Sequence, residues 1–260
     1  MLNNRITEQD SPYSDLEKKS VAEILSEINA EDTKVPLAVA KAIPGIELLV
    51  TKIVERMLTG GRIFYIGAGT SGRLGVLDAS EIPPTYGVSA GMVNGIIAGG
   101  DTALRNAVEN AEDDMNAAWE ELKSKHLHKY DTIIGIAASG TTPYVIGGLR
   151  AARNYGLLTG AIVCNPDSPV AAEAEIVIEL IVGPEYVTGS TRMKSGTAQK
   201  LVLNMISTAT MIQLGRVKGN KMVNLKPTNL KLRNRAIRII CDSTGVDENR
   251  ALQLLELHGS

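Results

Sequence analysis

Five short apolar segments rich in β-branched residues recur along the middle of the chain, and helical patterns separate most of them. They are Arg62–Gly67, Met92–Ile97, Thr132–Ala137, Thr159–Cys164 and Ile176–Val182. Continuous apolar strands that alternate with helices are typical of a parallel sheet covered on both faces. The pattern predicts an α/β fold, a three-layer αβα sandwich with a five-stranded parallel sheet whose strand order cannot be read.

The helical segments divide the 260 residues into a main domain, 35–218, and two smaller parts. Gly60-Gly61 ends a long helix that leads into the sheet. Residues 1–34 are predicted to form an N-terminal helical arm and residues 219–260 a small C-terminal helical appendage. The expected helices are Leu16–Ile28, Val35–Leu58, Arg73–Glu81, Thr102–Lys123, Thr142–Tyr155, Thr191–Leu214, Asn229–Cys241 and Val246–Leu257.

Composition excludes several classes of function. The chain has 27 Lys and Arg against 29 Asp and Glu, without a basic block, so we expect no nucleic-acid partner. Cys164 and Cys241 lack the spacing of a disulfide framework or a zinc site, so we expect no metal and a reducing, cytoplasmic location. No apolar run approaches the ~20 residues of a membrane helix, so we expect no membrane partner.

The loop Gly67–Gly72 follows the first strand and matches the pattern G-x-G-x-x-G. A dinucleotide site is one interpretation, but the next strand ends in glycine, and Asp101 comes only after a glycine pair. Gly69, Thr70 and Ser71 instead combine backbone amides with two hydroxyls at a helix N-terminus, which suits a phosphate monoester. A glycine turn with an N-cap is the alternative.

A second loop repeats this chemistry after the third strand. Ser139, Gly140, Thr141 and Thr142 precede a proline at the first position of a helix. Capping by Thr142 alone would explain one such loop. Two hydroxyl-rich loops at the carboxyl ends of parallel strands favour a shared ligand site, because ligands of open α/β sheets bind at that edge.

Two acidic residues are candidates for proton transfer. Glu81 ends the helix that starts at the first loop, about two turns away, which is the reach of a six-carbon sugar phosphate. Glu112 lies in the acidic run Val108–Asp114, which could equally be a solvated helix face. Glu109 and Asp113 would share that face, so spacing alone does not choose among the three acids.

The segment Val187–Lys200 gathers hydroxyls and cations at the start of a helix. It could bind an anion, or it could be a capped helix start with solvated Arg192 and Lys194. The three histidines have no partner acid in the pattern, and we expect them at the surface.

Four runs carry a resemblance to a known family: IGAGTSGRLGVLDASE, VENAEDD, IAASGTTPYV and VTGSTRMKSGTAQKLVLNM. In this order and at these intervals they are similar to the signature of the N-acetylmuramic acid 6-phosphate etherases, and the similarity covers about residues 7–258. The broader sugar isomerase (SIS) domain, shared with aldose-ketose isomerases and the glucokinase regulatory protein, accounts only for the two phosphate loops.

The resemblance implies that the chain is a carbon-oxygen lyase whose catalytic glutamates are Glu81 and Glu112. It also implies that the enzyme needs no cofactor and works as a homodimer. Its substrate would be N-acetylmuramic acid 6-phosphate, and its products N-acetylglucosamine 6-phosphate and D-lactate, in amino sugar and cell-wall muropeptide recycling. A non-catalytic sugar-phosphate sensor and an aldose-ketose isomerase are the alternatives. The chain departs mildly from the family pattern, with Asn110 for Gly, Thr141 for Arg, Ser195 for Ala and Asn224 for Asp.

Overall fold

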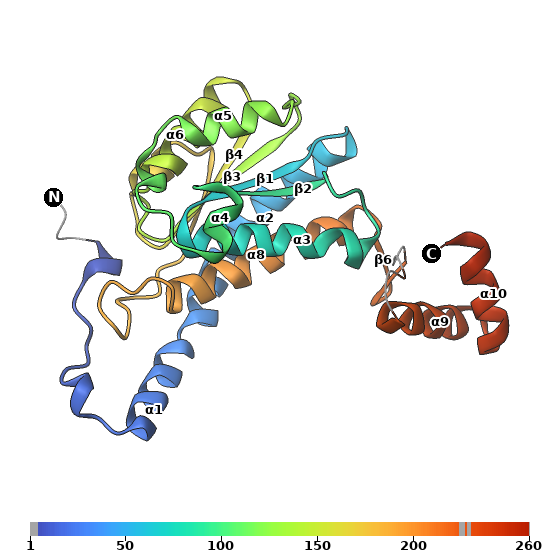
Figure 1. Ribbon diagram of the computed structural model, residues 1–260, viewed down its shortest axis with the longest axis horizontal. Coiled ribbons are helices and arrows are strands. Elements are labelled where there is room, and N and C mark those ends of the chain that lie inside the picture. Colours follow the sequence, from blue (N-terminus) through green and yellow to red (C-terminus); the bar gives the residue numbers. More distant parts are fainter. Residues whose placement is uncertain (1–4, 224–226, 228–229, 260) are drawn as a thin grey trace.

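The sheet in the computed structural model is five-stranded and parallel, in the order β2-β1-β3-β4-β5 (Figure 1). The structure describes residues 5–223, 227 and 230–259. The strands are β1 (Ile63–Gly67), β2 (Val93–Ile97), β3 (Thr132–Ala137), β4 (Leu158–Val163) and β5 (Ile176–Glu179), which confirms the predicted fold class. Their order places β3 directly beside β1, so the two predicted phosphate loops leave neighbouring strands.

Helices cover both faces of the sheet. Alternate residues of β1 point to opposite sides, so Ile63 and Tyr65 enter one core and Phe64 and Ile66 the other. The first core is completed by α2 (Val35–Leu58), α3 (Gly69–Tyr86) and α8 (Lys194–Gln213). The second is completed by α5 (Ala117–Ser124), α6 (Pro143–Asn154) and α7 (Pro169–Ala172).

Helix α3 lies unusually close to the sheet because glycines line the contact. A Cβ on Gly95 of β2 would approach the Cα of Val76 to 2.5 Å, and one on Gly75 would approach the Cβ of Tyr65 to 2.9 Å. Neither position tolerates a side chain without displacing the helix. The backbone of α3 is therefore fixed against β1 and β2 from the first loop onward.

The acidic run does not form the single helix expected over Thr102–Lys123. Instead α4 (Gly100–Arg105), a 3₁₀ turn η3 (Ala111–Asp113) and α5 are separate elements. The helix ends early because the backbone becomes extended at Asn106, with φ −121° and ψ 150°, and then passes through the left-handed region at Asn110, with φ 61°. Asparagine adopts that region more readily than most residues, which explains why it can stand where the family has glycine.

The boundaries of two other helices also differ from the predicted ones. Helix α3 continues past Glu81 and through Pro83 and Pro84 to Tyr86. The expected helix Leu16–Ile28 is a 3₁₀ turn, η2 (Leu16–Lys18), followed by α1 (Val21–Asp32). Ser20 starts α1 there because it forms a capping box with Glu23.

The two ends of the chain lie outside the sandwich (Figure 1). The arm begins with η1 (Ile6–Glu8) and passes along the carboxyl edge of the sheet, where Thr7 is fully buried. A hairpin of β6 (Val217–Lys218) and β7 (Lys221–Met222) leads to α9 (Leu230–Thr244) and α10 (Glu248–His258), which pack on each other. Asn224 and Asn229 lie outside the described residues. No helix among the described residues is long and apolar enough to cross a membrane.

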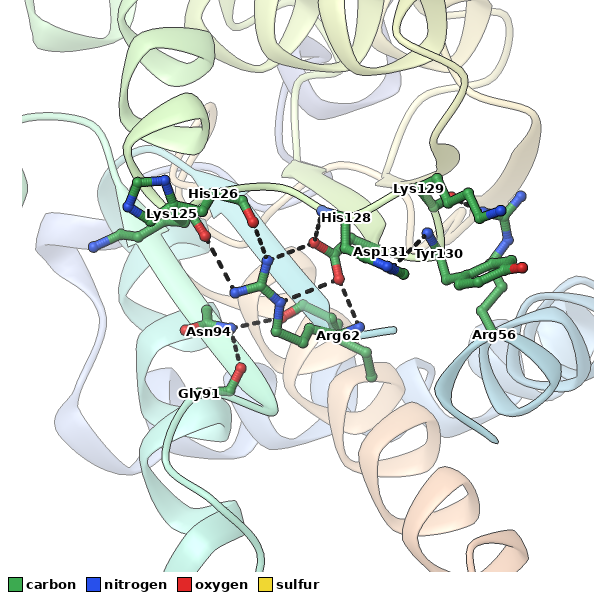
Figure 2. A network of polar contacts seen from close by, with 11 residues as sticks. Arg56, Arg62, Gly91, Asn94, Lys125, His126, His128, Lys129, Tyr130 and Asp131 are labelled. Carbon is green, nitrogen blue, oxygen red and sulfur yellow. Dashed lines mark hydrogen bonds and ion pairs between the residues drawn. The ribbon is translucent and has the colours of Figure 1, made fainter. Parts of the chain in front are cut away.

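A polar network closes the amino edge of the sheet, at the end opposite the phosphate loops (Figure 2). The buried Asp131 carboxylate accepts hydrogen bonds from the Arg62 side chain and from the backbone amides of Arg62 and His128. Arg62 also donates to the carbonyls of Lys125 and His126. The network holds the start of β1 against the loop before β3; His126 contributes its carbonyl, and Nδ1 of His128 accepts from the Tyr130 amide at 3.5 Å.

Replacing Asp131 with Ala should lower the free energy of unfolding by about 3 kcal/mol, because Arg62 and two amides lose a buried charged acceptor. Urea denaturation measures the change. Asp242→Ala is the matched control: its ion pair with Lys221 is about half exposed, and its loss should cost less than about 1 kcal/mol. Equal effects of the two substitutions would contradict a structural role for the buried network.

Candidate active site

The first hydroxyl loop joins β1 to α3 in the predicted way. Gly69 opens the helix with a φ of 52°, and the Gly72 amide donates to the Ala68 carbonyl at 3.1 Å. A Cβ on Gly72 would lie 2.7 Å from the Gly67 oxygen, so the loop closes tightly on the end of β1. Thr70 and Ser71 are thereby held at a helix N-terminus, where free amides favour an anion.

The Ser71 hydroxyl is already engaged. It donates to Oε1 of Gln199 on α8 at 2.9 Å, and both side chains are buried. The Gln199 amide nitrogen is buried without a hydrogen-bond partner among the described residues. Sequence reasoning did not assign a role to Gln199, although the residue lies within the singled-out segment. Ser71 therefore needs to turn away from Gln199 before it can donate to a ligand.

The second hydroxyl loop lies beside the first, after β3. Thr142 is the N-cap of α6, but its side chain makes no capping hydrogen bond, so capping by Thr142 does not explain the hydroxyls. The Ser139 oxygen accepts from the Thr141 amide at 3.3 Å and from the Thr141 hydroxyl at 3.1 Å. Because Ser139 accepts both bonds, its own proton remains available to a ligand.

The start of α8 binds an anion of the protein itself. The buried Glu185 carboxylate accepts hydrogen bonds from the amides of Lys194 and Ser195 and from the Ser195 hydroxyl. Lys194 is 2% exposed and pairs with the buried Glu31 of α1, so it is not the solvated lysine of the second interpretation. Arg192 is exposed, as expected. This helix start therefore positions the arm and is not open to a ligand anion.

Glu112 lies near the first loop. It lines a cavity of about 210 Å³ together with Gly69 and Arg73, and it is the exposed middle residue of the turn η3 that follows Asn110. Glu109 lines the same cavity, whereas Asp113 does not. The structure thus brings Glu112 and the amino end of α3 together.

Glu81 lies at the other end of α3. It is exposed and follows Ser71 by ten residues, which is ~15 Å of helix. Ten residues make about three helical turns, so that distance is longer than the two turns expected from the sequence. Within one chain, Glu81 and Glu112 lie toward opposite ends of the same helix.

A buried carboxyl, Asp78, precedes Glu81 by one turn. It accepts a hydrogen bond from the Ser207 hydroxyl at 3.0 Å. Burial, together with the charge of Glu81, raises the pKa of Asp78 to about 6, although the hydrogen bond from Ser207 and the nearby Tyr65 hydroxyl oppose this. Nothing in the sequence pattern distinguishes Asp78 from a surface acid of the helix.

Comparison with known proteins places this arrangement in a class. A family model for the glucokinase regulatory protein N-terminal SIS domain matches residues 46–153, and one for the SIS domain matches residues 114–209. The structure of phosphoheptose isomerase GmhA from Neisseria gonorrhoeae superposes with a TM-score of 0.58, at 16% identity, over 74% of this chain and 98% of that one. The structure of the Vibrio vulnificus NanR protein complexed with ManNAc-6P superposes with a TM-score of 0.53, at 15% identity, over 74% of this chain and 64% of that one. The fold and its paired loops define a sugar isomerase (SIS) domain.

The family within this class follows from closer relatives. The N-acetylmuramic acid 6-phosphate etherase of Bacteroides fragilis is 66% identical over 256 residues, 98% of this chain and 91% of the relative. That of Christiangramia forsetii is 60% identical over 254 residues, 98% of this chain and 93% of the relative. The chain belongs to the N-acetylmuramic acid 6-phosphate etherase family, which confirms the resemblance seen in the sequence.

The Glu31–Lys194 pair should make stability depend on acid pH. Burial alone would raise the pKa of Glu31, but hydrogen bonds from Lys194 and Lys34 lower it to about 2. Because folding lowers the pKa of Glu31, its carboxylate stabilises the folded state fully at pH values above its ordinary pKa of 4.5. This contribution to stability disappears as the pH falls toward 2. Urea midpoints should show Glu31→Gln less stable than wild type at pH 7, with the difference narrowing toward pH 3.

Glu17 supplies the matched control, because it is exposed on the same arm. Glu17→Gln should follow the wild-type midpoint across the whole range. A constant difference between Glu31→Gln and wild type from pH 7 to pH 3 would contradict the assigned ion pair.

Proposed function

We propose that this protein cleaves the D-lactyl ether of N-acetylmuramic acid 6-phosphate and releases N-acetylglucosamine 6-phosphate and D-lactate. The observation that carries the proposal is membership of the etherase family over 98% of the chain. The site supports it, because two hydroxyl loops at one sheet edge suit the 6-phosphate and Glu112 lies beside the first of them.

The chemistry requires two proton transfers. In the open-chain sugar the C1 aldehyde acidifies the C2 hydrogen, and Glu112 removes this proton. The C3–oxygen bond then breaks, Glu81 protonates the departing lactate oxygen, and a double bond remains between C2 and C3. Glu81 next takes a proton from water, which adds at C3, while C2 regains a proton. The aldehyde holds the electrons between steps, so each glutamate needs to contribute only roughly 10²–10⁴ in rate.

The alternatives have weaker support. The SIS-domain structures share under 25% identity with this chain, so they support the fold and no particular reaction. A sensor needs the hydroxyl loops but no pair of glutamates. An isomerase needs a base at C2 but no acid at the C3 oxygen. Formation of free D-lactate from the muramic acid phosphate separates the etherase from both.

Glutamine at each position should separate the two steps. Glu112→Gln should abolish both lactate release and exchange of the C2 hydrogen with D₂O, because the base is lost. Glu81→Gln should abolish lactate release and still let N-acetylglucosamine 6-phosphate take up deuterium at C2. A lactate assay and proton NMR measure the two readouts.

The wild-type reaction in D₂O is the reference for both variants. Product without deuterium at C2 would exclude elimination in favour of direct displacement. Exchange that survives in Glu112→Gln but not in Glu81→Gln would reverse the two roles, and absence of lactate with wild-type enzyme would reject the etherase itself.

The separation of the glutamates supports a homodimer in which each subunit completes its partner's site. A sugar anchored by Ser71 does not extend ~15 Å along α3 to Glu81 of the same chain. An apolar groove of about 590 Å³ between α2 and α8, lined by Ile43, Val50 and Met205 among others, offers a surface for pairing. In this arrangement Glu81 of the partner subunit faces Glu112.

Mixing two inactive variants tests the shared site. In a mixed dimer of Glu81→Gln and Glu112→Gln, one site carries both glutamates and the other carries neither. Equal amounts should recover about a quarter of wild-type lactate release, since half the dimers are mixed and each has one intact site. If each subunit supplied both glutamates to its own site, the mixture would stay inactive.

The same proposal places the reaction in the cytoplasm. Cys164 and Cys241 are free thiols, which fits a reducing compartment.

A further inference from the structure

The arm carries a cation to the second hydroxyl loop. Nη1 of Arg5 donates to the Thr141 hydroxyl oxygen at 3.0 Å, across 136 residues of sequence. The Thr141 hydroxyl donates in turn to Ser139, whose own proton is uncommitted. Hydrogen bonds therefore run from the Arg5 guanidinium to the Thr141 hydroxyl and from that hydroxyl to Ser139.

Buried hydrogen bonds fix the arm in this position. Thr7 is fully buried; its amide donates to Oδ1 of Asn165 at 3.2 Å, and its hydroxyl accepts from Nδ2 of Asn165 at 2.8 Å. Nδ2 of Asn165 also donates to the Ser139 carbonyl at 3.0 Å. One amide side chain thus joins the arm to the loop, and Arg5 lies only two residues before Thr7.

Most donors of Arg5 are unused. A guanidinium has five N–H donors, and only one bond, to Thr141, engages them within the described part of the chain. No carboxylate among the described residues pairs with Arg5. Lys194, by contrast, is neutralised by Glu31. Arg5 therefore keeps its charge and a free fork of donors beside a loop that otherwise offers only neutral groups.

We propose that Arg5 binds the 6-phosphate of the substrate as the cationic partner of the loop Ser139–Thr142. The inference rests on the proposed function and extends it, because it makes the N-terminal arm part of the substrate site. A phosphate dianion gains more from a charge-assisted, bidentate contact than from hydroxyls alone. The arm is thereby a binding element and not only a structural extension.

Arg5→Gln tests the contact. Michaelis constants for the muramic acid phosphate and competitive inhibition constants for inorganic phosphate should both rise about 10-fold or more, the effect of losing one charged hydrogen bond. The value of kcat should change much less, because the phosphate is remote from C2 and C3. Lys18→Gln, an equal change of charge at an exposed ion pair of the same arm, should leave both constants unchanged.

A second variant separates phosphate binding from a purely structural role of Arg5. Thr141→Arg in the Arg5→Gln background returns a guanidinium to the loop and should restore inhibition by inorganic phosphate. If Arg5 only anchored the arm, no recovery would follow, and the inference would be overturned.

Deuterium exchange into N-acetylglucosamine 6-phosphate, which lacks the lactyl carboxylate, identifies the bound anion. Its Michaelis constant should rise in Arg5→Gln as much as that of the substrate; an unchanged constant would assign Arg5 to the carboxylate and reject the proposal. Wild-type sensitivity of Arg5→Gln to inorganic phosphate would also reject it. Continued lactate release would then leave the proposed function intact.

Discussion

The parallel pairing of β1 with β3 is the constraint on which the site depends. Gly67 at the end of β1 is in register with Ile136 of β3, so the two strands end at the same level. Each then turns through a hydroxyl-rich loop into a helix, α3 or α6, whose first amides point at the same edge. Adjacent strand ends and helix N-termini thus bring together two loops far apart in sequence, as the proposed phosphate site requires.

Charged and amide groups attach the arm to this edge, beside a ring contact between Tyr13 and Tyr186. Glu31 of α1 meets Lys194 at the start of α8, and Glu185 satisfies the first amides of that helix. Asn165 provides the second attachment through Thr7. Such contacts are directional, so they fix where the arm passes as well as holding it. That precision is what allows a side chain near the N-terminus to reach a loop of the sheet.

The sequence predicted the parts of the fold that depend on local pattern. The strands agree with expectation to within a few residues, since buried parallel strands are continuous apolar runs, and both hydroxyl loops fall at strand ends as expected. The predicted helix Thr102–Lys123 was wrong, because the backbone becomes extended at Asn106 and left-handed at Asn110, inside a pattern that the neighbouring residues favour as helix. The order of the strands could not be predicted either, since it depends on which face of the sheet each connecting helix packs against.

Residues whose roles depend on distant partners were missed for the same reason. Gln199 meets Ser71 across 128 residues, Asp78 meets Ser207 across 129, and Arg5 meets Thr141 across 136. Periodicity and motif spacing report only on neighbours within a helix or loop. Thr141 illustrates the limit: its place in the family pattern indicated an absent cation, and only the fold shows that Arg5 lies against it.

The rigidity of α3 links these observations to catalysis. Its glycine contacts with β1 and β2 hold the helix against the sheet, so the positions of Ser71 and Glu81 relative to the strands are fixed. In the proposed dimer, one end of α3 anchors phosphate in its own site while the other end presents the acid to the partner's site. A twofold axis then makes both sites equivalent, and each depends on the length of the partner's helix. In the proposed dimer the acid and the base of one site therefore come from different subunits, and the interface between the subunits sets their separation.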